Sequence, residues 1–304
     1  MKPNIEILGE AKLLLIAKRW FWRIVLAYLA FNLISVLLGN IPNLVFGDAL
    51  IPANLKEANT PEEILSILKQ KKFLANLAII GSFTVFLSFL ARAISNTGIS
   101  KILLKGARNY DGTDWFKGAF CALKDPFGAL LLFVVWFFRV LWIPIFIIMP
   151  AMIFFSVDFM KNDEPNFLFF LTLPLALLSL KPFYRFRQIW FIKSERPELG
   201  ALEIMKESDS LMEGNKMKNF HLDCRYWKIF TLILLLMLIL TAITLVEEHM
   251  GQSPILALVH LASMGLVFYL AIYFNAYWDL GQAIFYREIS DEKKPLAAAQ
   301  SEEI

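Results

Sequence analysis

The sequence predicts an all-α protein: a polytopic transmembrane helical bundle of about six spans. Apolar residues make up 58% of its 304 residues and charged residues only 19%, whereas ordinary soluble domains are about half apolar and a quarter charged. The apolar residues also lie in long runs. A helix needs roughly 20 such residues to cross a hydrocarbon core about 30 Å thick, and several runs reach that length.

These runs define six expected spans within a single membrane domain, 21–286. The spans are expected at 21–46, 73–95, 128–155, 167–191, 220–245 and 255–285. The third and fourth spans each contain two prolines, which predict kinked helices. Residues 287–304 are expected to form a polar cytoplasmic tail.

Short amphipathic helices are expected outside the spans. Residues 1–20 mix apolar side chains with lysine and arginine, which is typical of an interfacial helix at the membrane surface. A second short helix is expected at Thr113–Leu123 and a third at Pro197–Glu213. Pro197 at the start of the third helix and Gly214 just past its end are the residues that such boundaries favour.

The distribution of charge predicts the orientation. With the N-terminus inside, the cytoplasmic segments hold 21 lysine and arginine residues and the outer segments hold 5, in agreement with the preference of these residues for the cytoplasmic side. Tryptophan favours the membrane boundary, and five tryptophans lie at the predicted cytoplasmic boundary: Trp20, Trp22, Trp190, Trp227 and Trp278. Both termini are therefore expected in the cytoplasm.

The two helix-bearing loops follow one plan. Each joins two spans, carries basic residues and contains one amphipathic helix. The plan reflects either a parallel internal repeat or convergent loop design, because the two segments share few identical residues.

The segment 183–230 carries the most distinctive motif. It combines a Tyr-Arg pair at the end of a span with a helix that leads into the next span, in the order Tyr184-Arg185, Ala201-Leu202, Ser208, Leu211-Met212, Gly214 and Lys216. This pattern resembles an uncharacterised bacterial membrane family known as domain of unknown function 975, which is similar to the membrane domain of some glycerophosphodiester phosphodiesterases. One departure is Asp223-Cys224-Arg225-Tyr226, where the family usually has Leu-Ser-Phe.

The resemblance covers most of the chain. It implies a helical membrane fold in a bacterial cytoplasmic (inner) membrane, and it implies no activity. The specific function therefore has to be sought in residues that interrupt the spans or lie between them.

Arg139 is the sharpest such residue, because it lies near the middle of the third expected span. A charge at that depth is costly and usually faces a partner or a water-filled cavity. One interpretation is an intramembrane anion or substrate site. The other is a structural pair with Asn32, Asn275 or Asp279, or a side chain that extends toward the membrane surface.

A basic cluster next to the membrane is a candidate contact for anionic lipid head groups. Its members are Lys206, Lys216, Lys218, Arg225 and Lys228. The same charges also serve the topology. The expected partners are thus the lipid bilayer, anionic lipids and a protein partner at the cytoplasmic face, with no nucleic acid.

The sequence favours no catalytic, metal or cofactor site. His221 and Cys224 have the spacing of half a zinc site, whereas a closed site needs four ligands. Cys121 and Cys224 are expected to be cytoplasmic reduced thiols. No phosphate-binding glycine loop, nucleophile elbow or HExxH motif occurs in the sequence.

Two functional hypotheses follow. The first is a non-enzymatic membrane protein that transports, or assists another machine in handling, a small anionic or lipidic substrate. The alternative is a structural or interaction protein whose cytoplasmic helices dock a partner or anionic lipid. A hydrated cavity near the middle of the bilayer would favour the first, and exposed apolar patches on the loop helices would favour the second.

Overall fold

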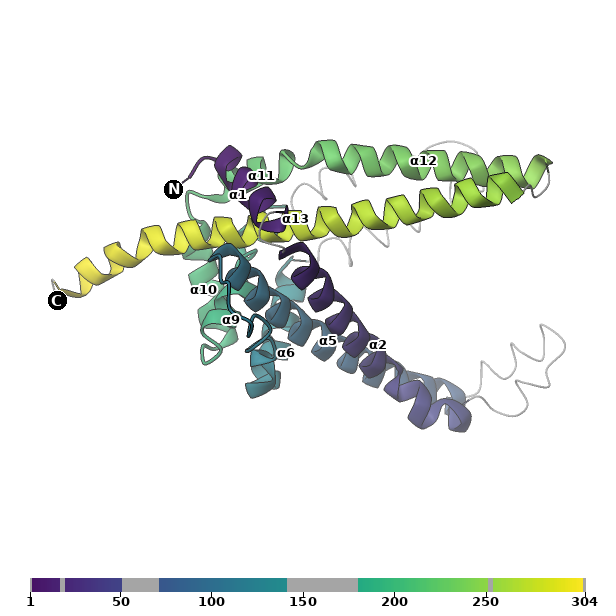
Figure 1. Cartoon of the computed structure of the whole chain (residues 1–304). Coiled ribbons are helices and arrows are strands. Elements are labelled where there is room, and N and C mark those ends of the chain that lie inside the picture. Colours follow the sequence, from purple (N-terminus) through teal and green to yellow (C-terminus); the bar gives the residue numbers. More distant parts are fainter. Residues whose placement is uncertain (1, 17–19, 51–70, 141–179, 251–253, 303–304) are drawn as a thin grey trace, which may run out of the picture.

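A computed structural model of the chain consists of helices and turns, with no strand among the described residues (Figure 1). The structure describes residues 2–16, 20–50, 71–140, 180–250 and 254–302. By length and composition, four helical segments could cross a membrane: Trp20–Pro42, Ala78–Ala107, Trp227–Thr244 and Leu258–Lys293. The helical, multi-pass architecture agrees with the prediction. The count of six spans stays a prediction, because residues 141–179 lie outside the described residues.

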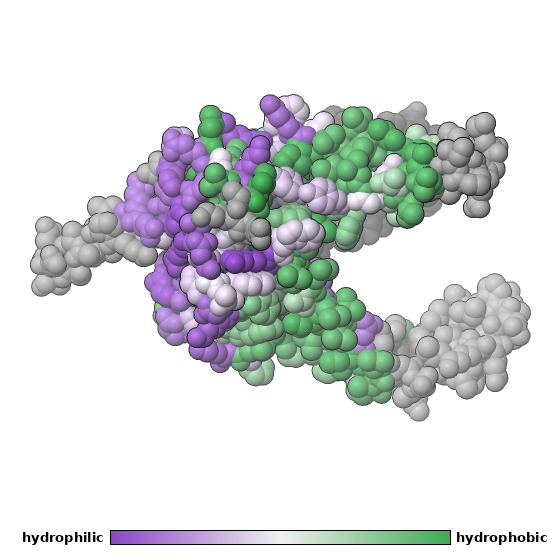
Figure 2. All heavy atoms as spheres, viewed as in Figure 1, coloured by the Kyte–Doolittle hydropathy of each residue, from purple (hydrophilic) through white to green (hydrophobic). Residues whose placement is uncertain are grey.

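Two pairs of long helices form two arms that diverge from a common junction (Figure 1). In one arm α2 (Trp20–Leu50) packs on α5 (Lys71–Ala107), and in the other α12 (Trp227–Met250) packs on α13 (Pro254–Glu302). Helix α13 also contacts α5 near the junction. Figure 2 shows hydrophobic residues covering the arms and hydrophilic residues gathered at the junction. The arms therefore have the surface that a bilayer requires.

Three helix ends differ from the expected span boundaries. Helix α5 continues to Ala107 rather than ending at residue 95, and α13 continues to Glu302 through most of the expected tail. The expected fifth span is divided, because α11 (Lys216–Cys224) ends before α12 begins at Trp227. Hydropathy marks where an apolar run ends, whereas a helix continues as long as its backbone bonds and packing allow.

The third expected span is described only in its first part. Helix α6 (Pro126–Val140) begins with Pro126 at its first position, and the backbone N–H of Gly128 donates to Oδ1 of Asp125 at 2.9 Å. Such a side-chain acceptor satisfies one of the free N–H groups at a helix start. Most of the fourth expected span lies outside the described residues. Its described part is helical over 180–185 and then turns before α9 (Ile189–Glu195).

Helix α10 (Ala201–Met212) is the third short helix expected from the sequence. It begins four residues later than predicted, where the N–H of Gly200 donates to Glu203 at 2.9 Å. Gly214, with φ of +76°, follows its end as expected. One face of α10 is buried in the protein core: Ala201, Ile204, Met205, Ser208, Leu211 and Met212.

The α-helix expected at Thr113–Leu123 is wrong. Residues 113–120 form turns, followed by a short 3₁₀ helix, Cys121–Lys124. Gly118 has a φ of +83°, which an α-helix does not accommodate. The Lys105 ammonium also donates to the carbonyls of Asp114 and Lys117 at 2.8 Å each, which holds the chain in this turned form.

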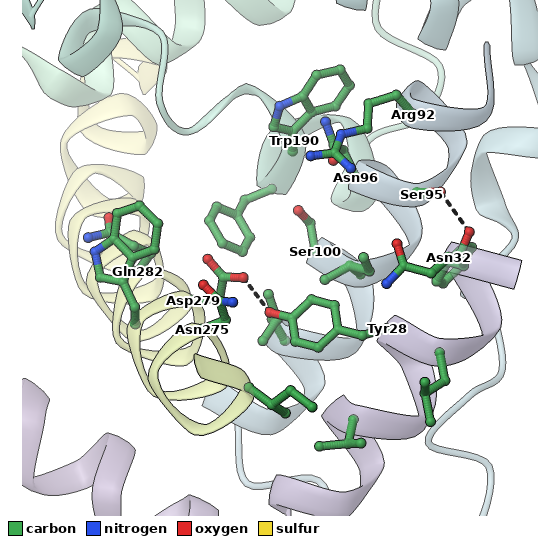
Figure 3. A pocket seen from close by; sticks show the side chains of 18 of the residues that line it. Tyr28, Asn32, Arg92, Ser95, Asn96, Ser100, Trp190, Asn275, Asp279 and Gln282 are labelled. Carbon is green, nitrogen blue, oxygen red and sulfur yellow. Dashed lines mark hydrogen bonds between the residues drawn. The ribbon is translucent and has the colours of Figure 1, made fainter. Parts of the chain in front are cut away.

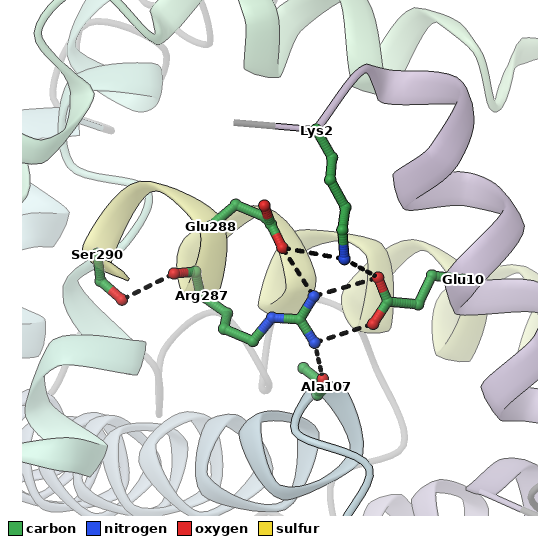
Figure 4. Close-up of polar contacts among 6 residues, drawn as sticks. All are labelled: Lys2, Glu10, Ala107, Arg287, Glu288 and Ser290. Atoms are coloured by element: carbon green, nitrogen blue, oxygen red, sulfur yellow. Dashed lines mark hydrogen bonds and ion pairs between the residues drawn. The ribbon is translucent and has the colours of Figure 1, made fainter. Parts of the chain in front are cut away.

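The N-terminal helix α1 (Asn4–Ile16) packs on α13 as part of the core. Ion pairs fasten it there (Figure 4): Arg287 donates to both Glu10 oxygens at 2.9 and 3.1 Å, and Lys2 bridges Glu10 and Glu288. Arg287 also donates to the carbonyl of Ala107 at the end of α5. Helices α1, α9, α10 and α11, with residues 108–125, thus form one cohesive unit at the junction, called here the polar end.

Candidate functional site

A polar cavity lies where the two arms meet the polar end. Its volume is about 550 Å³, and its walls come from α2, α5, α6, α9 and α13, with residues 183–187. Figure 3 shows that the polar side chains of α2, α5 and α13 converge on it. A hollow of this size that is lined by aromatic and polar side chains has the character of a small-molecule site.

Helix α5 supplies a polar stripe to the cavity. Arg92, Asn96 and Ser100 recur every four residues and so lie on one face of the helix, with Ser95 beside them. Arg92 makes no hydrogen bond or ion pair with the residues that the structure describes. Arg92 is exposed on the surface of an apolar arm, and an arginine there without a protein partner is free to bind an anion.

Helices α2 and α13 supply the facing walls. The Tyr28 hydroxyl donates a hydrogen bond to Oδ2 of Asp279, which ties the two arms together across the cavity (Figure 3). Asn32 and Asn275 line the cavity near this pair. The structure thus brings three of the predicted intramembrane residues, Asn32, Asn275 and Asp279, into one site.

A hydrogen-bond network around Asp223 lies beside the cavity, which three of its members line: Arg187, Trp278 and Gln282. The Asp223 carboxylate accepts from the Arg187 guanidinium, from the Tyr184 hydroxyl at 2.7 Å, from the Trp278 indole at 2.6 Å and from the Gln282 amide at 2.9 Å. Arg187 is nearly buried, with 8% of its side chain exposed. The charge of Arg187 is therefore neutralised within the protein, unlike that of Arg92.

Aromatic rings enclose Arg187 as well. Its guanidinium lies 4.8 Å from the ring centre of Trp278, 5.0 Å from that of Phe183 and 5.3 Å from that of Tyr184. Cation–π contacts of this kind gain strength where water is excluded. Arg187 therefore acts as a fixed joint between residues 183–187, α11 and α13.

Arg139 does not lie in the cavity. It lines a separate groove with Lys181 and Arg185, and its guanidinium lies 5.8 Å from the ring centre of Phe186. The expected pairing of Arg139 with Asn32, Asn275 or Asp279 is absent among the described contacts. The position of Arg139 in an apolar run predicted a place near the middle of a span, but it did not predict that α6 packs against α10 of the polar end.

The five basic residues expected to contact lipid lie on α10, on α11, just after α11 and in the first turn of α12. Lys206, Arg225 and Lys228 are exposed. Lys216 lies 3.7 Å from Asp209, and the backbone carbonyl of Lys218 accepts from Asn4 at 2.9 Å. Their side chains are therefore spread over the polar end and do not line a common hollow among the described pockets.

Both cysteines are free thiols, with Cys121 buried and Cys224 exposed. Burial raises the pKa of the Cys121 thiol, which keeps it protonated and unreactive. Within the described ranges no three histidine, cysteine, aspartate or glutamate residues are grouped as a metal ion would require.

Three important residues escaped the sequence analysis: Arg92, Arg187 and Asp223. Arg92 lies inside the second expected span, so the depth argument applied to Arg139 could have found it. Arg187 was counted only among the basic residues that set orientation. Asp223 was recognised only as a departure from the family pattern, and no local signal shows that its partners come from residues 184–187 and α13.

Lys193 connects the two helix-bearing loops. Its side chain is fully buried, and its ammonium donates to Asp125 at 2.9 Å and to the carbonyl of Pro197 at 2.7 Å. The hydrogen bonds from Lys193 and from the Gly128 N–H hold the pKa of Asp125 below its usual range. The carboxylate is thus stabilised in its charged form in the folded protein.

This contact predicts a loss of stability in acid. A carboxyl group whose pKa is lowered by folding contributes stability above its unfolded pKa and loses it as the pH falls through the folded value, here below about pH 4. We expect the apparent melting temperature of Asp125→Asn to lie below that of the wild type at pH 6, with the gap narrowing toward pH 3. Asp111→Asn, which removes an exposed carboxylate on the same segment, should leave the profile unchanged. A gap that stays constant over this range would contradict the prediction.

Comparison with known protein families, with curated proteins and with solved structures found no match to this chain.

Proposed function

We propose that this protein is a non-enzymatic membrane protein that binds a small anionic solute or amphiphile in the polar cavity, and transports it or passes it to another membrane component. The proposal includes six spans in a bacterial cytoplasmic membrane with both termini inside, and kinship with the domain of unknown function 975. Support for the location comes from the charge asymmetry and from the motif in residues 183–230.

The observation that carries the proposal is the unpartnered Arg92 in a polar cavity. Arg92 is exposed on an arm whose surface is otherwise apolar, and a guanidinium placed there in a bilayer is costly unless an anion or water meets it. A carboxylate or phosphate on the ligand would supply that partner, because the planar guanidinium can donate two parallel hydrogen bonds to either group. A ligand bound in the cavity would therefore be the partner that Arg92 lacks among the described residues.

The remaining lining residues suit the rest of such a ligand. Asn32, Asn96 and Asn275 offer both donors and acceptors, and the rings of Trp190 and Trp278 offer apolar walls. Asp279 is engaged by Tyr28 and disfavours a second negative charge nearby. The fitting ligand therefore carries its negative charge at the α5 side and polar, uncharged groups toward α13.

The alternative, docking of a partner by amphipathic loop helices, has less support. The apolar face of α10 is buried in its own protein, and Leu202, at 57% exposed, is the large apolar side chain that α10 leaves open. Residues 113–120 form turns instead of a helix with a free face. The cavity is thus the better candidate.

Thiol labelling in membranes tests the proposal. In a Cys121→Ala/Cys224→Ser background, Asn32→Cys places a thiol in the cavity, whereas Leu33→Cys places one on the neighbouring, outward face of α2. We expect water-soluble methanethiosulfonates to modify the first and not the second, because lipid-facing thiols stay protonated and unreachable by charged reagents.

Charge preference then tests the role of Arg92. With Asn96→Cys as reporter, one turn from Arg92, we expect Arg92→Gln to lower the ratio of anionic to cationic reagent rates on the order of ten-fold. Equal labelling of Asn32→Cys and Leu33→Cys, or an unchanged rate ratio in Arg92→Gln, would overturn the proposal.

A further inference from the structure

A second hollow gathers three cations on the outside of the protein. Arg139 of α6 with Lys181 and Arg185 line a groove of about 400 Å³, and Phe138, Pro182 and Phe186 complete it. These six residues are called the cation groove. It shares no lining residue with the polar cavity, so an inference about it is independent of the proposed function.

The positive charges of the cation groove are largely uncompensated. Arg185 pairs with Asp209 of α10, but Arg139 and Lys181 make no hydrogen bond or ion pair with the described residues. The guanidinium groups of Arg139 and Arg185 both lie over the ring of Phe186, at 5.8 and 5.3 Å from its centre. Both cations therefore contact the same ring and line the same groove, an arrangement that an anion in the groove would stabilise.

An apolar strip leads to the groove. The exposed side chains of Phe127, Leu131 and Phe138 lie on one face of α6, with 74%, 55% and 53% exposed. This strip ends beside Arg139, which follows Phe138 directly. Exposed apolar side chains of α6 therefore lie next to the cations of the groove.

We propose that the cation groove binds the phosphate of an anionic phospholipid, and that the exposed apolar side chains of α6 next to the groove contact its acyl chains. Arg139 and Lys181 contact the phosphate. Arg185, which is paired with Asp209, adds electrostatic attraction for the phosphate. A soluble phosphate would use the same cations but would gain nothing from the apolar strip. The strip is therefore the reason to favour a lipid.

Native mass spectrometry of the full-length protein in detergent tests this site. Phosphatidylglycerol is titrated against the wild type, against Arg139→Gln/Lys181→Gln, and against Lys117→Gln/Lys124→Gln, which removes two exposed cations outside the groove. Basic residues near a membrane surface contribute about one kcal/mol each to anionic-lipid binding, so the groove variant should bind about thirty-fold more weakly. The matched control should stay within about two-fold of the wild type.

Three more measurements distinguish a phospholipid site from a general anion site and from misfolding. Phosphatidylcholine should bind equally weakly to all three proteins, and inorganic phosphate should not displace phosphatidylglycerol. Arg139→Lys/Lys181→Arg, which keeps both charges, should retain binding and shows that a loss does not reflect misfolding. The proposal would be overturned if the groove and control variants lost affinity for phosphatidylglycerol equally, or if the groove variant kept its affinity. Displacement of phosphatidylglycerol by inorganic phosphate would also overturn it.

Discussion

Replacing Asp223 with alanine should destabilise the protein more than breaking any of its exposed ion pairs. The side chain of Arg187 is 8% exposed and that of Asp223 is 16% exposed, so the variant leaves a guanidinium buried without its counter-charge. Removing one partner of a buried pair costs about 3–5 kcal/mol. At about 2–3 °C per kcal/mol for a chain of this size, the apparent melting temperature in detergent should fall by roughly 10 °C.

A double variant separates the charge from the packing. Arg187→Gln/Asp223→Asn removes both charges and keeps polar groups of similar size, so it should lose less stability than Asp223→Ala alone. Asp209→Asn provides a matched control, because it breaks the exposed pair with Arg185, which contributes at most about 1 kcal/mol. Equal effects of Asp223→Ala and Asp209→Asn would show that the network around Asp223 is not a structural joint.

The predictable part of this structure is the part set by local pattern. Apolar runs located the four described candidate spans, because the length of such a run is itself the physical requirement for crossing a bilayer. Gly214 correctly marked the end of α10, because a left-handed residue after a helix favours glycine. The failures at Thr113–Leu123 and at the start of α12 have the opposite origin. The turns at 113–120 are held by Lys105. The break between α11 and α12 lies beside Asp223, whose partners come from residues 184–187 and α13. Local sequence patterns reveal neither set of contacts.

The candidate site follows the same division. Asn32, Asn275 and Asp279 could be named in advance, because polar residues in apolar runs are conspicuous. Their assembly with Arg92 rather than with Arg139 depends on how α2, α5 and α13 pack, and on the position of α6 beside α10. Composition along the chain carries no information on either arrangement. The candidate residues were thus predictable, whereas the grouping of these residues was not.

Gly98 of α5 should tolerate no side chain. A Cβ at this position would lie 2.2 Å from Cζ of Phe31 and 2.4 Å from the carbonyl oxygen of Ala119. The Phe31 ring could rotate, but the Ala119 oxygen belongs to the backbone, so α5 would have to move away from residues 113–120. Overpacking of this kind costs about 1–3 kcal/mol, so the apparent melting temperature of Gly98→Ala should fall by roughly 2–9 °C.

Gly81→Ala is the matched control, because it makes the same substitution in the same helix where a Cβ would meet no atom within 4 Å. Alanine is the better helix former by up to about 1 kcal/mol, so this variant should be as stable as the wild type or slightly more so.

In the Gly98→Ala background, Phe31→Leu removes the ring contact and leaves the carbonyl contact, so it should restore only part of the lost stability. Full restoration would place the constraint in the ring alone. No loss in Gly98→Ala itself would mean that α2, α5 and residues 113–120 are less closely packed than this structure has them. Because Phe31 also lines the polar cavity, the close approach at Gly98 is what fixes the α2 wall of the cavity against α5.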